Sequence, residues 1–175
     1  NTRHNIGFKI IDAINSHFKL SKQKPKFKGL LTTGNIDEKK IYAIKPLTFM
    51  NNSGTAIKEL IDYFKIDAKD VFVFHDDLDI DFGKIKTKFG GSSAGHNGIE
   101  SIDKFIGKDY SRVRIGIGHP KKKKKVNNHV LEDFKEDEEE KINEITGNIV
   151  KQLPTLIEKK IDLFSSKVNQ NLNGI

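Results

Sequence analysis

The sequence predicts an α/β fold, a three-layer sandwich in which helices flank a mixed, mostly parallel twisted sheet. Two observations predict it. Short apolar runs of strand length alternate along the chain with helical patterns of apolar residues, an order typical of α/β proteins. The chain has 175 residues, a length that suits one domain with a single core. Because no internal repeat and no clear linker interrupts it, we expect one domain over residues 1–175.

Strands are predicted where short runs rich in β-branched and aromatic residues end at turn-forming residues. They are expected over residues 28–33, 40–44, 71–74, 85–89 and 113–117. The first two flank a turn at Gly34-Asn35, and Pro46 ends the second. The run at 71–74 is apolar throughout, as expected for a strand that is buried on both faces.

Helices are predicted where apolar residues recur every three or four positions. They are expected over residues 5–19, 55–64, 99–106 and about 137–168. Pro154 is expected to kink the last of these or to start a second helix there. Between the last strand and the C-terminal helices, residues 119–128 read as a basic loop that contains the run Lys121 to Lys125.

Composition limits the classes of function. With 31 Lys+Arg against 24 Asp+Glu the net charge is +7, which favours a polyanionic partner such as nucleic acid, or an anionic membrane surface. A lysine-rich proteome from an AT-rich genome accounts for this charge about as well. The lack of cysteine excludes disulfides, thiolate nucleophiles and Cys-ligated zinc. Neither an apolar run of the roughly 20 residues that span a bilayer nor a signal-peptide pattern is found, so a cytoplasmic location and no membrane partner are expected.

Four polar clusters hold the residue types that ester hydrolysis needs. They are Thr2-Arg3-His4-Asn5, Met50-Asn51-Asn52-Ser53, His75-Asp76-Asp77-Leu78-Asp79 and Gly95-His96-Asn97-Gly98. Hydrolysis requires a general base for water, a group that orients the base, and hydrogen-bond donors for the oxyanion. His, Asp and Asn side chains can fill these roles without a metal, a cofactor or a covalent intermediate. Residues 49–53 and 75–79 also follow predicted strands, where sites form in α/β sheets.

Other kinds of site are disfavoured by spacing. A calcium loop that starts at Asp77 has its glycine, Gly83, one place too late, and Lys88 stands where a bidentate Glu is needed. The Gly-rich residues 90–98 lack the Gly-Lys-Ser/Thr ending of a P-loop. The sequence contains no Gly-x-Ser-x-Gly elbow and no His pair with zincin spacing.

Five blocks, taken in order, resemble the motif set of bacterial peptidyl-tRNA hydrolases. They are Thr2-Arg3-His4-Asn5-Ile6-Gly7, Lys45-Pro46-Leu47-Thr48-Phe49-Met50-Asn51-Asn52-Ser53-Gly54, His75-Asp76-Asp77-Leu78-Asp79, Gly90-Gly91 through Gly95-His96-Asn97-Gly98, and Arg112-Val113-Arg114-Ile115-Gly116-Ile117-Gly118-His119-Pro120. The resemblance covers residues 1 to about 135, and the C-terminal helices match only in general character. It implies an enzyme without metal or cofactor that cleaves the ester between a peptide and the 3′ end of tRNA. We expect it to act as a monomer.

The resemblance also implies roles for individual residues. His4 falls on the base that takes a proton from water, and Asp76 falls on the carboxylate that orients it. Asn51 is expected to hold the peptide, and Asn97 to place the water or stabilise the oxyanion. The other expected substrate contacts are Met50, Phe49 and His96. The family begins with a strand and a Gly-Asn-Pro-Gly-like turn that supplies a third site asparagine, whereas this sequence starts at Asn1, immediately before the first block. Either such a segment precedes Asn1 in the full protein, or the chain lacks that strand.

Lys86, Lys88 and Arg114 are candidate contacts to tRNA phosphates, the alternative being ordinary solvated charge. The resemblance places Lys88 and Arg114 on the clamp that reads the 5′-phosphate of tRNA, where two cations favour a free monophosphate through charge-assisted hydrogen bonds. The Lys121–Lys125 run falls in the family's lid region beside the site. Asp77 and Asp79 are interpreted as structural residues that cap and bridge their loop.

Two further hypotheses stay open on the sequence. One is a non-catalytic RNA-binding relative that keeps the fold and the basic surface. The other is a different esterase or peptidase on a similar α/β scaffold, because a fold alone does not determine the substrate.

Overall fold

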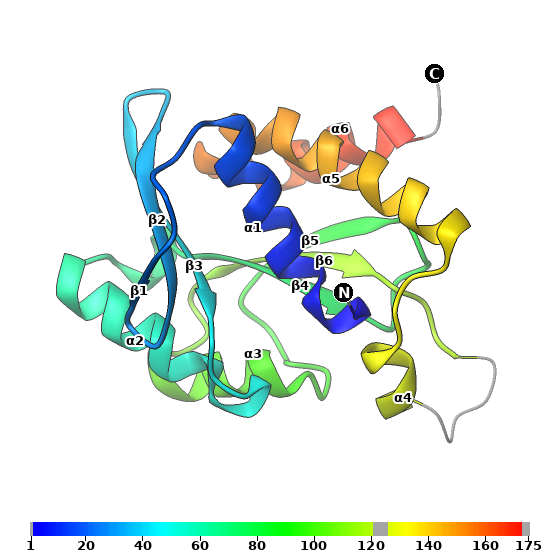
Figure 1. Cartoon of the computed structure of the whole chain (residues 1–175), viewed down its shortest axis with the longest axis horizontal. Helices are drawn as coiled ribbons and strands as arrows, with labels where there is room; N and C mark the ends of the chain where they lie inside the picture. The colour runs from blue at the N-terminus through cyan, green and yellow to red at the C-terminus, as the bar shows by residue number, and fades with distance from the viewer. Residues whose placement is uncertain (1, 121–125, 173–175) are drawn as a thin grey trace. The chain divides into compact units, whose positions relative to one another are not determined.

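The computed structural model describes residues 2–120 and 126–172. The chain forms two compact units. Unit 1 is drawn from Asn1–Ala13, Phe74–Lys88 and Arg112–Ile175, and unit 2 from Ile14–Val73 and Phe89–Ser111. The predicted α/β class, with a mixed sheet and flanking helices, is confirmed (Figure 1).

Helices and strands follow one another largely as predicted. In chain order they are α1 (Ile6–His17), β1 (Lys24–Lys26), β2 (Gly29–Ile36), β3 (Lys39–Pro46), α2 (Ser53–Phe64), β4 (Phe72–Asp77), β5 (Ile85–Phe89), α3 (Asn97–Ile106), β6 (Ser111–Gly116), α4 (Val126–Leu131), α5 (Glu136–Ile157) and α6 (Ile161–Leu172). Short 3-10 helices cover Arg3–Asn5 (η1), Met50–Asn52 (η2) and Ala68–Asp70 (η3). Strand β1 and helix α4 are not among the predicted elements, since both are short, with three and six residues.

Unit 2 contains an antiparallel sheet in the order β1-β2-β3. Its second hairpin turns at Asp37 and Glu38, whose φ angles are 46° and 66°. Two successive positive φ angles are typical of a type I′ turn, which matches the twist of the flanking strands. The predicted turn at Gly34-Asn35 is therefore wrong, because both residues lie within β2 and pair with β3.

The core of unit 2 forms where α2 and α3 pack together next to the sheet. Its buried residues are Leu31, Ile57, Leu60, Ile61, Ile102 and Tyr110. The two helices approach closely at Gly54, where an added Cβ would lie 2.3 Å from the carbonyl oxygen of Ser101. The amide of Gly54 donates a hydrogen bond to the Ser101 hydroxyl at 3.0 Å. Only glycine permits this approach, so the position is set by packing.

The second sheet has the order β4-β6-β5, with β6 in the middle. Backbone bonds from Ser111 to the carbonyl of Val71 and from Ile117 to that of Asp77 advance together along β6 and β4, so these strands are parallel. Strand β5 runs antiparallel to β6. The sheet is mixed, as predicted, but antiparallel pairs outnumber parallel ones once β1-β2-β3 is included. The prediction of mostly parallel pairing is wrong because β1, β2 and β3 are joined by tight turns and not by helices, so consecutive strands run antiparallel.

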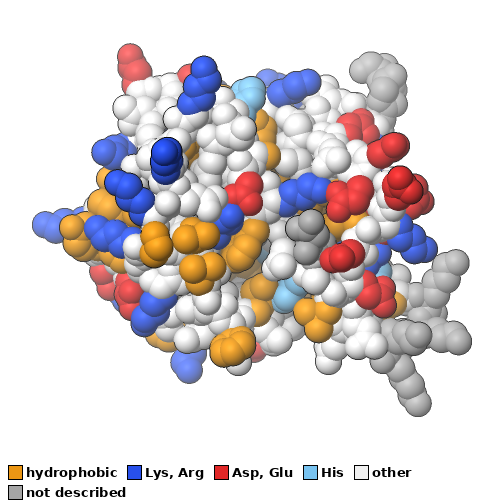
Figure 2. Space-filling model, viewed as in Figure 1, with side chains coloured by type: hydrophobic (Ala, Val, Ile, Leu, Met, Phe, Trp, Pro, Cys, Tyr) orange, Lys and Arg blue, Asp and Glu red, His pale blue; other side chains and the backbone are white. Residues whose placement is uncertain are grey.

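The C-terminal helices α5 and α6 lie side by side in unit 1 (Figure 1). Buried residues of the two helices include Ile142, Ile145, Ile149, Leu153, Phe164 and Val168. Pro154 lies inside the last turn of α5, and α6 begins only at Ile161, so Pro154 does not start a second helix. Acidic side chains gather where α5 begins, with Glu136 to Glu139 in its first turn (Figure 2). This placement suits the positive end of the helix dipole.

Within residues 2–120 and 126–172, none of the helices combines the length and the apolar character that a membrane span requires. The basic loop expected over residues 119–128 is replaced from Val126 onward by α4. The Lys121–Lys125 run lies outside the described residues.

Candidate active site

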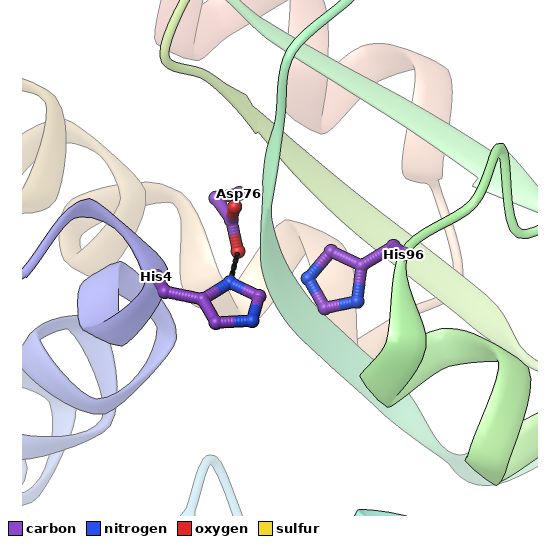
Figure 3. A group of neighbouring side chains, drawn as sticks. All are labelled: His4, Asp76 and His96. Atoms are coloured by element: carbon purple, nitrogen blue, oxygen red, sulfur yellow. Dashed lines mark hydrogen bonds and ion pairs between the residues drawn. The ribbon is translucent and has the colours of Figure 1, made fainter. Parts of the chain in front are cut away.

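In unit 1 the structure brings together His4 and Asp76, the predicted base and its orienter (Figure 3). His4 lies in η1, just before α1, and Asp76 lies near the carboxyl end of β4. The His4 Nδ1 and Asp76 Oδ1 atoms are 2.8 Å apart, and the two side chains are 17% and 3% exposed. A buried carboxylate at this distance holds the imidazole ring in one orientation, as a base–orienter pair requires.

Gly7 explains how the helix carrying His4 approaches the strand carrying Asp76. An added Cβ at Gly7 would lie 2.4 Å from the carbonyl oxygen of Phe74 in β4. Any side chain at this position would push the start of α1 away from the strand. The glycine at the end of the first sequence block is thus required by the close approach that forms the pair.

Arg3, the residue before His4, anchors the same segment to residues 133–138. It is 3% exposed, and its guanidinium donates to the carbonyl of Asp133 at 2.9 Å and to Glu138 Oε2 at 2.7 Å. The guanidinium also lies over the Phe134 ring, 5.3 Å from its centroid. Sequence reasoning missed this role, because the partners are about 130 residues away and no local pattern indicates them.

Replacing Arg3 with Met is expected to lower the free energy of unfolding by about 3 kcal/mol, because a buried ion pair loses one partner. Urea denaturation measures the loss. The matched control is Lys9→Met: Lys9 and Glu139 also join α1 to α5, at 2.5 Å, but each is about one third exposed. That variant should lose less than about 1 kcal/mol. Equal losses in the two variants would contradict the anchoring role of Arg3.

The three candidate phosphate contacts also lie in unit 1. Lys86 and Lys88 are exposed on β5, and Arg114 is 23% exposed on β6. Arg114 donates from Nε to Asp77 Oδ2 at 2.8 Å, while Asp77 Oδ1 accepts the amide of Asp79 at 2.9 Å. Asp77 therefore bridges the loop after β4 and fixes the Arg114 guanidinium, in line with its expected structural role.

In unit 2 the remaining candidates come together where η2 packs against the start of α3. Met50 and Asn51 belong to η2, and Asn97 is the first residue of α3. An added Cβ at Gly98 would lie 2.6 Å from the Met50 sulfur, so this contact is close. Asn51 and Asn97 are exposed, as an amide that binds a ligand must be.

His96 and Phe49 flank this group. His96 precedes α3 and its Nδ1 accepts the amides of Gly98 and Ile99 at 3.1 and 3.2 Å, so it caps the helix that carries Asn97. Phe49 precedes η2 and is 88% exposed, more than any other large apolar side chain in the described part of the chain. The capping role of His96 was not expected from the sequence, because histidine is not among the residues preferred at a helix N-cap.

A histidine held by a buried carboxylate on an α/β scaffold can serve as a general base for water, an arrangement used by hydrolases. A family model described as "Peptidyl-tRNA hydrolase" matches residues 1–174 and so spans both units. The chain belongs to the peptidyl-tRNA hydrolase family.

Relatives of known name support the same assignment. The peptidyl-tRNA hydrolase of Pelagibacter ubique is 73% identical over 169 residues, which cover 97% of this chain and 91% of that protein. The enzyme of that name from Ehrlichia ruminantium is 44% identical, covering 95% of this chain and 86% of the relative. Among solved structures, the crystal structure of peptidyl-tRNA hydrolase from Acinetobacter baumannii has a TM-score of 0.89 at 31% identity, covering 96% of this chain and 86% of that one.

Proposed function

We propose that this protein hydrolyses the ester bond between a peptide, or an N-blocked amino acid, and the 3′ end of tRNA, recycling tRNA from stalled or abortive translation. The observation that carries the proposal is the His4–Asp76 pair, with its carboxylate buried, in a chain of this family. A relative that is 73% identical bears the name of this activity. Because the substrate arises at the ribosome, the proposal places the protein in the cytoplasm, acting as a monomer on peptidyl-tRNA.

In the proposed mechanism His4 is the general base. An ionised Asp76 accepts a hydrogen bond from Nδ1–H of His4, so Nε2 is the basic nitrogen of the neutral ring. Nε2 takes a proton from water while the water oxygen attacks the ester carbonyl. The tetrahedral intermediate then collapses, the bond to the ribose oxygen breaks, and His4 returns the proton to that oxygen. The products are a peptide carboxylic acid and a tRNA with a free 3′ hydroxyl.

The asparagines are proposed to act on the substrate itself. Asn97 places the water or donates a hydrogen bond to the oxyanion, and Asn51 holds the peptide next to the scissile ester. A neutral amide suits both tasks, since it offers a donor and an acceptor without adding charge. The exposed ring of Phe49, together with Met50 and His96, is proposed to complete the contacts to the substrate.

Lys88 and Arg114, with Lys86 beside them, are proposed to bind the 5′-phosphate of tRNA. Lys88→Glu is then expected to raise KM about tenfold for a substrate with a 5′-phosphate and far less for a dephosphorylated one, because a charge-assisted hydrogen bond is replaced by repulsion. Steady-state kinetics on the two substrates measures this. Lys151→Glu, an exposed position on α5, controls for the change in net charge. Equal effects of Lys88→Glu on both substrates would remove Lys88 from the clamp.

The experiment that tests the proposed activity compares substrates. Peptidyl-tRNA, free peptides and simple esters are offered to the protein at equal concentration, and product release is followed for each. Release from peptidyl-tRNA that is at least about a hundredfold faster supports the proposal, as expected when remote binding energy contributes to catalysis. Comparable rates on simple esters would favour a general esterase on this scaffold.

A further inference from the structure

Strand β5, which carries Lys86 and Lys88, is an edge strand in the order β4-β6-β5. Two backbone bonds give its register against β6: Gly116 donates to the carbonyl of Lys84 at 2.8 Å, and Gly90 donates to that of Tyr110 at 3.0 Å. The residue numbers run in opposite directions, so the pair is antiparallel. Because backbone groups alternate in direction along a strand, those of Ile85 point to the outer side of β5, away from β6.

This register places like charges opposite one another across the two strands. Lys86 lies opposite Arg114, and Lys88 lies opposite Arg112. Directly opposed like charges destabilise strand pairing, because residues that face each other share one side of the sheet. Asp77 offsets the charge of Arg114, but among the described residues β5 pairs with a strand on one side only, so another element must hold its outer side if its lysines are to keep a defined position.

Helix α6 supplies that support on the outer side of β5. The amide of Ile85 donates to Asn169 Oδ1 at 3.0 Å, and Asn169 Nδ2 donates to the carbonyl of Ile85 at 2.9 Å. One side-chain amide thus replaces the pair of bonds that a neighbouring strand would make. A third bond between β5 and α6 runs from the Thr87 hydroxyl to the carbonyl of Ile161 at 2.9 Å. The side chains of Ile85 and Thr87 alternate with those of Lys86 and Lys88, so α6 holds the strand while both lysines stay exposed.

We propose that Asn169 is a positioning residue for phosphate recognition: its side-chain amide fixes the edge strand β5 so that Lys86 and Lys88 are held beside Arg114. This inference rests on the proposed function, since it concerns the discrimination of 5′-phosphorylated tRNA. Asn169 is not proposed to contact the ester. Loss of the Asn169 side-chain amide is therefore expected to raise KM for tRNA substrates that carry a 5′-phosphate and to leave kcat nearly unchanged.

The test is Asn169→Leu, assayed on N-blocked aminoacyl-tRNA with and without its 5′-phosphate. Leucine is similar in size but satisfies neither backbone group of Ile85. The ratio of kcat/KM for the phosphorylated substrate to that for the dephosphorylated one is expected to fall about fivefold, as when part of a charge-assisted hydrogen bond is lost. The fall should come from a higher KM for the phosphorylated substrate. Asn171→Leu, the same change at an exposed position of α6, should leave the ratio unaltered. Thr87→Val, which removes the bond to Ile161 with little change in volume, should lower the ratio by a smaller factor.

The outcomes separate the two proposals. If Asn169→Leu keeps the wild-type ratio, or if it lowers kcat equally on both substrates, Asn169 does not position the clamp and the proposed function stands. If Asn169→Leu does not fold, Thr87→Val decides: an unchanged ratio overturns the inference, and a lowered ratio supports it. If the wild-type protein cleaves neither substrate, the proposed function fails and the inference falls with it.

Discussion

His4→Ala is expected to release an N-blocked amino acid from tRNA about 10²–10⁴-fold more slowly than the wild-type protein, the range that a positioned general base contributes. The loss should appear in kcat, with KM little changed, because the imidazole acts on water in the transition state. Single-turnover release at saturating enzyme measures it. The control is His17→Ala, since His17 is exposed at the other end of α1.

Added imidazole should restore part of the activity of His4→Ala, because it can take the proton that the missing side chain would accept. The same addition should leave the His17→Ala protein unchanged. A His4→Ala protein with wild-type kcat would show that the base lies elsewhere, and the functional reading of the first sequence block would then be wrong.

Asp76→Asn is expected to lower kcat by about 10²–10⁴-fold, because an amide no longer favours the tautomer with its proton on Nδ1. The measurement is kcat under the same single-turnover conditions. The chain contains a matched control: His119 Nε2 and Asp79 Oδ1 are 2.7 Å apart, but both side chains are about 60% exposed. Asp79→Asn should therefore leave kcat within about twofold of wild type. A similar loss in both variants would mean that any His–Asp contact matters equally, which contradicts a specific role for the contact with the buried Asp76 carboxylate.

Most of the helices and strands could be predicted from the sequence because they have strong apolar patterns. The strand predicted at residues 85–89 has the bounds of β5, and the helix predicted at 55–64 differs from α2 by two residues at its start. The turn between β2 and β3 was predicted at the wrong residues, because Asp37-Glu38 is not a common type I′ pair while the nearby Gly34-Asn35 is a much stronger turn signal. The prediction of mostly parallel pairing was wrong because strand direction depends on tertiary pairing, which no short pattern contains.

The candidate site also has features that the sequence could predict and features that it could not. The His4–Asp76 bond could be predicted because both residues stand in blocks of distinctive sequence. The anchoring of Arg3, the cap made by His96 and the support of β5 by Asn169 could not. Each depends on one side chain that meets a backbone or side-chain group in a particular folded geometry. Asn169 also lies in the C-terminal helices, where the sequence resembles the family only in general character.

The measurement that tests the central claim most directly is the release of an N-blocked amino acid from its tRNA by the full-length protein and by His4→Ala, side by side, with a chelator present. We expect fast release by the wild-type protein, unaffected by the chelator, and a loss of at least about a hundredfold in the variant. Tight binding of tRNA without release by the wild-type protein would contradict the claim, and an RNA-binding function on this fold would then be the better account.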